Sequence, residues 1–418
     1  MMPRKTLRVV VLVIGWTSLW LGLATAGLPR LAAPCLNGFA GPYPCQHVDL
    51  LRHLTLDELS PATTPPAYRW VSDLWGWVDP TDGREYALVN VERGVSVVDL
   101  SDPSNAFRAA FIDAPLPVDD PRGRTKDLKV YQNHAFIVSE ISGHGMQVID
   151  LRQLPAVVQV AWFQGFGRAH NITINETSGF AYISGSDSCS GLAIVDIREP
   201  AAPSAVGCYD AHGYSHDAHC VSYPAQSAYP NQEICFDFSA DQLVILDVTN
   251  KSAITTLSTA TYSGRGYIHQ GWTSDDRQYL YQDDEFDELA QGINTTTYIW
   301  DIADLSNPQL VSTFTGPTTA TDHNLYVKGN RIYQANYSAG MRILDVSQPT
   351  QPCEVGYFDL LPASNAPGFE GAWTAYPYLP SGTLLLSGRQ QGLFVLSPNN
   401  LPPCPTLPSA LYLSLVMR

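Results

Sequence analysis

The sequence predicts an all-β fold, a seven-bladed β-propeller of four-stranded blades, from a strand phrase that recurs and from the spacing of its copies. Each copy is a short run of aliphatic and β-branched residues, and an acidic residue and a turn follow the first six. The acidic positions of those six copies are 44 to 54 residues apart, close to the length of one propeller blade. The seven copies are Gly94–Leu100, Gly145–Leu151, Gly191–Ile197, Gln242–Val248, Thr297–Ile302, Gly340–Val346 and Gly392–Ser397.

Further strands flank each phrase. A second strand precedes it, as in Tyr86–Val89, and a third follows after a turn, as in Ala205–Tyr209. An innermost strand completes four per blade, and the ring leaves only short sheet edges. The last repeat lacks an evident outer strand after Ser397, so we expect residues 410–416 to supply it and close the ring, or else to act as a sorting signal.

The chain begins with features of a secretory signal peptide. Arg4, Lys5 and Arg8 precede an apolar run over residues 9–23, and small residues follow up to Ala26. We therefore expect a signal peptide over 1–26 and a secreted or cell-surface protein, with no membrane insertion once the leader is removed. The predicted organisation continues with an N-terminal segment over 27–69 containing a short helix within 47–59, a propeller over 70–400 and a tail over 401–418.

Charge and cysteine content narrow the function classes. The formal net charge of −16 disfavours binding to nucleic acid and to anionic membranes, so we expect a monomer whose partner is an extracellular ligand or protein. Eight cysteines in an exported chain favour disulfides. Eight cysteines allow about 105 pairings. Proximity in the sequence suggests Cys35–Cys45, Cys189–Cys208, Cys220–Cys235 and Cys353–Cys404.

Several phrases resemble a known family. They are the segment Cys35–Cys45, Trp75-Gly-Trp77, the segment His134–Glu140, His269-Gln-Gly-Trp272 and the segment Asp322–Tyr326. Together with the repeats they resemble the LVIVD-repeat proteins of the choice-of-anchor B family over roughly residues 35 to 400. The resemblance implies a surface propeller whose relatives differ in their anchoring tails, and it implies no particular reaction.

Histidines recur in register just before the innermost strands. Residues that enter these strands line one mouth of a propeller channel, so equivalent positions of successive blades converge on the axis. Imidazoles and a carboxylate there suit zinc, copper, iron or manganese. The alternative is that the histidines make hydrogen bonds at strand starts or to water in a polar channel. The predicted metal ligands are His170, His216, His269, His323 and Glu370.

Other side chains are candidate neighbours of this ring. Lys126 and Asp127 precede the histidines in register, and His219 competes with His216, although only one of the two can face the axis from a strand. Asp283 and Glu285 are further candidates if their loop folds inward. The acidic run that contains them is expected to be a solvated loop, with a calcium site as the alternative. The calcium ligands would be Asp283, Asp284, Glu285 and Asp287.

Two other recurrent residue types have simpler interpretations. The acidic residues that end the strand phrases are expected to make turn hydrogen bonds, not to catalyse a reaction. Tryptophans recur at the innermost strands, where we expect core packing in preference to a carbohydrate platform. These tryptophans are Trp75, Trp77, Trp272 and Trp373.

The sequence therefore predicts an exported propeller that binds a ligand, with a metal ion as the specific hypothesis, at an axial ring of histidines. One alternative is a metal-dependent hydrolase or lyase with Glu370 or Lys126 as acid or base. The other is an interaction scaffold without a metal.

Overall fold

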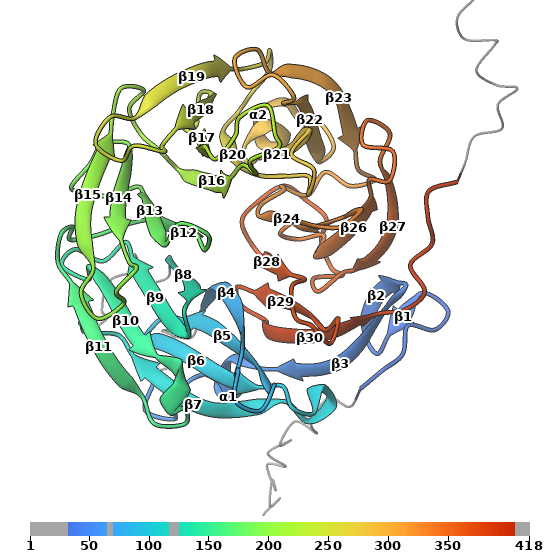
Figure 1. Ribbon diagram of the computed structural model, residues 1–418. Helices are drawn as coiled ribbons and strands as arrows, with labels where there is room; N and C mark the ends of the chain where they lie inside the picture. The colour runs from blue at the N-terminus through green and yellow to red at the C-terminus, as the bar shows by residue number, and fades with distance from the viewer. Residues whose placement is uncertain (1–31, 65–69, 117–124, 406–418) are drawn as a thin grey trace, which may run out of the picture. The chain divides into compact units, whose positions relative to one another are not determined.

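A computed structural model describes residues 32–64, 70–116 and 125–405, and it shows seven sheets arranged around a central axis (Figure 1). Six sheets are four-stranded and antiparallel, and the seventh adds two short N-terminal strands to the same plan. The predicted seven-bladed propeller is confirmed. The predicted signal peptide lies outside the described residues, and so does the segment 410–416.

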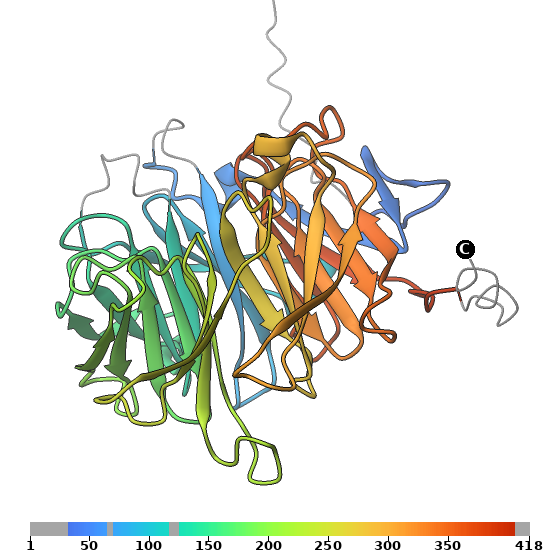
Figure 2. The same ribbon diagram turned by 90° about the horizontal axis from the view of Figure 1, so that it is seen from above.

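Each blade runs from an innermost strand on the axis to an outer strand at the rim, as Figures 1 and 2 show. The first three blades are β4 (Val71–Val78), β5 (Glu85–Val91), β6 (Gly94–Asp99) and β7 (Phe107–Asp113); β8 (Lys126–Tyr131), β9 (His134–Ser139), β10 (Met146–Asp150) and β11 (Val158–Phe163); and β12 (Asn171–Asn175), β13 (Phe180–Ser184), β14 (Leu192–Asp196) and β15 (Ser204–Tyr209). The next two are β16 (Asp217–Ser222), β17 (Glu233–Phe238), β18 (Leu243–Asp247) and β19 (Thr255–Ala260); and β20 (Ile268–Thr273), β21 (Tyr279–Asp284), β22 (Thr296–Asp301) and β23 (Gln309–Thr315). The last two are β24 (Leu325–Lys328), β25 (Arg331–Ala335), β26 (Met341–Asp345) and β27 (Cys353–Phe358), extended by β2 (Tyr43–Gln46) and β1 (Phe39–Ala40); and β28 (Ala372–Tyr376), β29 (Leu384–Gly388), β30 (Gly392–Pro398) and β3 (Val48–Leu54).

The recurrent phrase forms the third strand of each blade, and its apolar side chains fill the space between neighbouring blades. One core cluster, for example, joins Leu88 and Val97 of the first blade to Ile137 and Ile149 of the second. Both faces of these strands are buried, which explains why the phrase is a continuous apolar run instead of an alternating one.

The acidic residues that end the phrases have the structural role expected of them. In each case a carboxylate oxygen accepts a hydrogen bond from the backbone N–H two residues later, across the turn that leaves the strand. The prediction is confirmed for Asp99, Asp150, Asp196, Asp247, Asp301 and Asp345.

The ring closes through an N-terminal strand. β3 pairs antiparallel with β30, with Leu50 opposite Leu396, and Figure 1 shows these two strands side by side in one blade. The outer position expected for residues 410–416 is therefore taken by residues 48–54. The propeller accordingly includes residues well before the expected start at 70.

The helix expected within 47–59 is wrong over most of that range. α1 covers only Leu56–Leu59, with Thr55 and Glu58 forming a capping box at its start. Strand pairing prevails over residues 48–54 because β30 would otherwise lack an outer partner, and because the strand places Leu50 and Leu54 in the core.

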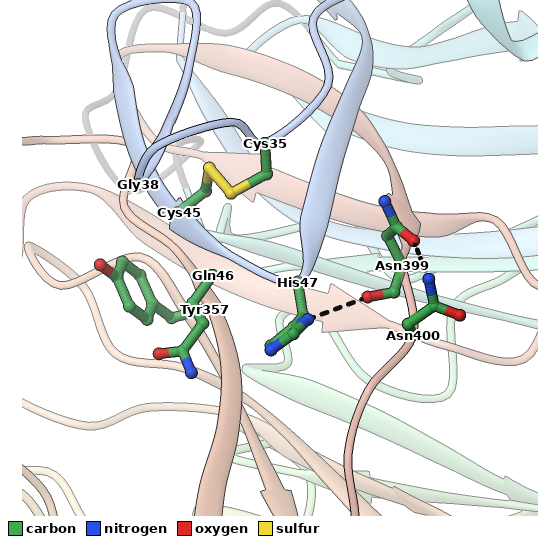
Figure 3. Close-up of a pocket in the computed structure, with 8 residues that line it drawn as sticks. All are labelled: Cys35, Gly38, Cys45, Gln46, His47, Tyr357, Asn399 and Asn400. Atoms are coloured by element: carbon green, nitrogen blue, oxygen red, sulfur yellow. Dashed lines mark hydrogen bonds between the residues drawn. A yellow bond between two sulfur atoms is a disulfide. The ribbon is translucent and has the colours of Figure 1, made fainter.

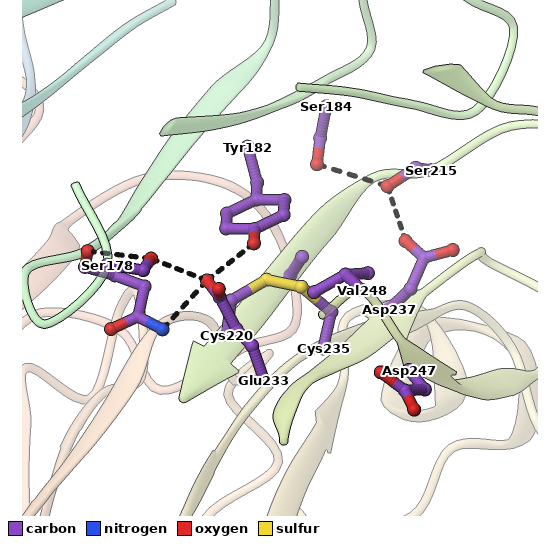
Figure 4. The surroundings of a disulfide bond; sticks show 12 residues. Ser178, Tyr182, Ser184, Ser215, Cys220, Glu233, Cys235, Asp237, Asp247 and Val248 are labelled. Atoms are coloured by element: carbon purple, nitrogen blue, oxygen red, sulfur yellow. Dashed lines mark hydrogen bonds between the residues drawn. A yellow bond between two sulfur atoms is a disulfide. The ribbon is translucent and has the colours of Figure 1, made fainter. Parts of the chain in front are cut away.

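All four predicted disulfides are present. Cys35–Cys45 holds the N-terminal loop next to a surface pocket, where His47 Nδ1 donates to the Asn399 carbonyl at 3.1 Å (Figure 3). Cys220–Cys235 links directly opposite residues of β16 and β17 (Figure 4). Cys353–Cys404 fixes the chain beyond the last blade to β27. In the described part of the chain, no helix is long and apolar enough to cross a membrane.

A buried polar chain lies beside the Cys220–Cys235 disulfide. The Ser215 hydroxyl donates to Asp237, and the Ser184 and Ser215 hydroxyls are 3.0 Å apart (Figure 4). Burial raises the pKa of Asp237 to about 7, although the bond from Ser215 acts against the shift. The ionised form of Asp237 therefore opposes folding.

The pairing of β3 with β30 predicts that a substitution in β3 destabilises the protein more than one in the exposed N-terminal loop. Leu50→Ala should lower the free energy of unfolding by about 2–4 kcal/mol, since Leu50 is buried in the closing blade. The matched control is Leu36→Ala, in the same N-terminal region but 64% exposed, which should change it by less than about 0.5 kcal/mol. Urea unfolding followed by tryptophan fluorescence measures both. Equal losses in the two variants would contradict the role of β3.

Asp237 predicts a pH dependence of stability with a definite sign. The pKa of Asp237 is higher in the folded than in the unfolded protein. The free energy of unfolding should therefore fall as the pH rises from about 4 through about 7. Asp237→Asn keeps an acceptor for Ser215 and removes the charge, so the variant should gain up to about 4 kcal/mol over the wild type between pH 4 and 8. Urea unfolding across that range tests this, with exposed Asp241→Asn as control. A difference between Asp237→Asn and wild type that does not change with pH would contradict it.

Candidate functional site

Four histidines from successive blades form a contiguous arc at one mouth of the channel. His170 and His216 immediately precede β12 and β16, His269 lies in β20, and His323 comes two residues before β24. The ring centroids of neighbours are 4.4 Å apart for His170 and His216, 4.4 Å for His216 and His269, and 4.6 Å for His269 and His323. The convergence expected from the repeat register is what the structure shows.

Each imidazole is held through its Nδ1 atom. The Nδ1 atoms of His216 and His323 lie 3.1 and 2.7 Å from the carbonyls of His269 and Trp373. A carbonyl oxygen only accepts, so both Nδ1 atoms carry the proton and both Nε2 atoms keep a lone pair. The Nδ1 of His269 lies 3.1 Å from Asp283 Oδ1, which also accepts from the Gln270 amide. Such outer contacts orient histidines as metal ligands.

Burial favours the neutral form of three of these imidazoles. It lowers the pKa of His269 and of His216 well below the usual value, with the neighbouring imidazoles adding to the effect. It lowers the pKa of His323 to about 3. Because a metal ion binds neutral imidazole, these residues need not lose a proton to become ligands at neutral pH.

His170 differs from the other three. Burial acts to lower its pKa, but the hydrogen bond and charge of Glu140, 2.5 Å from His170 Nδ1, outweigh burial and raise it. His170 is therefore the member of the arc suited to carry a proton.

Glu285 is the carboxylate that faces the Nε2 atoms of His269 and His323. Its Oε2 lies 3.9 Å from His269 Nε2, and its Oε1 lies 3.8 Å from His323 Nε2. One ligand atom from each of the three buried residues lies within 4.8 Å of the others. Two ligands of a tetrahedral zinc ion are about 3.3 Å apart, so the three ligand atoms would have to draw together by up to about 1.5 Å per pair to complete such a site. Burial raises the pKa of Glu285 to about 7, although the bond from the Tyr337 hydroxyl, 2.6 Å away, acts against the shift.

Glu370, expected in the ring, occupies a different position. It is exposed, and the three-residue group that could hold a metal contains Glu285 in its place. The signal that points to Glu285 is a second register, the residue directly after the second strand of each blade. Antiparallel pairing puts this residue at the same channel mouth as the start of the innermost strand. Glu140 and Arg389 occupy the same position in their blades, after β9 and β29.

The remaining candidate neighbours lie elsewhere. Lys126 is buried, its amine donates to the carbonyls of Val91 and Glu92, and burial lowers its pKa to about 7. His219 contacts Trp272 and lies 3.1 Å from the Thr273 hydroxyl, so of the pair only His216 joins the arc, as expected for a strand.

Asp127 belongs to a charged cluster further along the innermost strands. The Lys129 ammonium lies 2.6 Å from Asp127 and 3.0 Å from Asp73, and all three are buried. This ion-pair cluster lies among polar residues contributed by several innermost strands, including Asp217 and Asn324.

The acidic run is not the solvated loop that was expected. Asp283, Asp284, Asp287 and Glu288 are at most 1% exposed, because β21 continues to Asp284 and α2 (Asp287–Gln291) folds back over the blade. Asp284 accepts from the Tyr262 hydroxyl and from the amides of Gly266 and Tyr267, and Asp287 accepts from the Tyr298 hydroxyl. Calcium binding by Asp283, Asp284, Glu285 and Asp287 stays a prediction.

The tryptophans make packing contacts. Trp77 is 4% exposed and stacks on Tyr86, Trp75 contacts Tyr376, and Trp272 lies over His219. Trp373 packs against His323, with ring centroids 4.5 Å apart.

Comparisons with known proteins identify the repeat. A family model described as the LVIVD repeat matches residues 166–211, 237–260 and 322–359. The chain contains LVIVD repeats. Each segment lies within one blade, and the first and last include His170 and His323. No curated protein matches the chain. A crystal structure of the computationally designed Ika8 protein is similar, with 10% sequence identity, a TM-score of 0.47, and coverage of 78% of this chain and 82% of that chain.

Proposed function

We propose that this protein is an exported propeller that binds a divalent transition-metal ion at the channel mouth, with His269 Nε2, His323 Nε2 and Glu285 as ligands. The observation that carries the proposal is the approach of two buried imidazole Nε2 atoms to the two oxygens of one carboxylate, at 3.9 and 3.8 Å. Two histidines and a glutamate form a ligand set used for zinc and, with open positions, for iron(II). Copper and manganese are the other candidates.

Export is supported by the N-terminal leader pattern and by four disulfides, which persist in oxidising compartments. The resemblance of several phrases to the choice-of-anchor B family also supports a secreted or cell-surface location.

A metal-dependent hydrolase or lyase is the second candidate. The supporting observation is the His170–Glu140 pair, which places a proton-carrying imidazole at the end of the same histidine arc. A metal ion held by three protein ligands leaves a position where water is activated, and His170 is placed to exchange a proton nearby. An interaction scaffold without a metal is the remaining alternative.

The metal proposal predicts residue-specific loss of binding. Metal-free wild-type protein titrated with Zn²⁺ by calorimetry should bind one ion, and His269→Ala and His323→Ala should each weaken binding at least about 100-fold, since each removes a ligand. The matched control is His219→Ala, a buried histidine outside the arc, which should bind as the wild type does.

If the wild type binds zinc saturably and His269→Ala binds it equally well, the ion lies elsewhere. If the wild type does not bind zinc, copper, iron(II) or manganese saturably, the result favours an interaction scaffold without a metal. A parallel titration with Ca²⁺ tests the predicted calcium site, and retained calcium binding in His269→Ala would separate the two sites.

A further inference from the structure

Aromatic side chains continue outward from the histidine arc. Tyr267 contacts His216, with ring centroids 5.1 Å apart, and Tyr337 contacts His323 at 4.8 Å. Two phenylalanines join these tyrosines, since Phe286 lies 4.8 Å from Tyr267 and 5.7 Å from Phe369, and Phe369 lies 5.6 Å from Tyr337. Tyr267, Phe286, Phe369 and Tyr337 thus form an unbroken series that starts and ends on the histidine arc, and we call it the aromatic rim.

The rim is exposed in its middle and more buried at its two ends. Tyr337 is 1% exposed, whereas Phe286 is 37% and Phe369 is 39% exposed. The two phenylalanines come from different blades, after β21 and before β28; Phe286 directly follows Glu285, and Tyr337 separates Phe369 from His323. Core packing accounts for the buried Tyr337 and the half-buried Tyr267, but it does not require two blades to present phenylalanine rings to solvent at the same mouth. Exposed apolar surface beside polar groups is typical of a ligand site.

A cation lies next to the same mouth. The Arg389 guanidinium is 5.0 Å from the centroid of Trp373 and 5.9 Å from that of Tyr337, the two aromatic rings that pack against His323. An anionic group bound near His323 would therefore meet a positive field from Arg389 as well as from a metal ion.

We infer that the site takes an aromatic compound carrying an anionic oxygen donor, whose ring packs on Phe286 and Phe369 while its oxygens reach the metal ion. The inference rests on the proposed function, because the oxygen donor needs a metal to bind. Aromatic surface supplies affinity for a flat ring through offset and edge contacts, and the open metal positions accept a chelating oxygen pair.

The test uses two chelators that differ in the ring alone. Protein loaded with Co²⁺ is titrated with benzohydroxamate and with acetohydroxamate, and binding is followed by the visible absorption of the cobalt ion. The wild type should bind benzohydroxamate at least about tenfold more tightly, since only that ligand buries a ring on the rim. Phe286→Ala/Phe369→Ala should reduce this preference to less than about threefold and leave Co²⁺ affinity unchanged.

Two controls make the outcome specific. Phe107→Ala removes a phenylalanine that is 57% exposed on β7, and it should keep the full preference. Phe369→Ala alone should give an intermediate preference. Co²⁺ binding without any preference for benzohydroxamate would overturn the inference and leave the metal site standing, whereas failure to bind Co²⁺ would remove both.

Discussion

The antiparallel pairing of β3 with β30 is the contact on which the rest of the structure depends. It joins residues 48–54 to residues 393–398 and completes the seventh blade. The histidines come from four successive blades and are 46 to 54 residues apart in sequence, so the packing of blade on blade, not the local chain, holds them in contact. Core clusters that span neighbouring blades transmit this constraint around the axis, because close-packed interiors tolerate little displacement.

The metal-binding chemistry proposed for the channel mouth follows from the burial of the histidines and of Glu285. Carbonyls fix the protons of His216 and His323 on Nδ1, and Asp283 holds His269, so the Nε2 atoms near Glu285 are prepared before any ion arrives. Burial keeps these imidazoles neutral and raises the pKa of Glu285. A bound cation would favour the ionised carboxylate and compensate the cost of burying it, which gives the site an electrostatic reason to take an ion.

The sequence predicted those features that repeat. Seven phrases at blade spacing predicted the propeller, and the register of the histidines predicted their convergence, because equivalent positions of blades occupy equivalent places around the axis. Proximity predicted the disulfides correctly, since each bridge joins two cysteines that are consecutive in the sequence.

The sequence did not predict features that lie outside the repeated position before each innermost strand. The closing strand comes from a segment whose apolar spacing also fits a helix, and only the unpaired edge of β30 decides between them. Glu370 follows the register of the innermost strands but is exposed, whereas Glu285 follows the second strand and reaches the axis through antiparallel pairing. The charge of the acidic run predicts a solvated loop. Its carboxylates are buried instead, because they accept hydrogen bonds from tyrosine hydroxyls and a backbone amide in other parts of the blade.

The most direct test of the account is anomalous X-ray diffraction from crystals of the zinc-loaded protein, measured on both sides of the zinc absorption edge. The account predicts one strong anomalous peak within about 2.2 Å of His269 Nε2, His323 Nε2 and a Glu285 oxygen. A peak at any other position, or none at the channel mouth in saturated crystals, would contradict it.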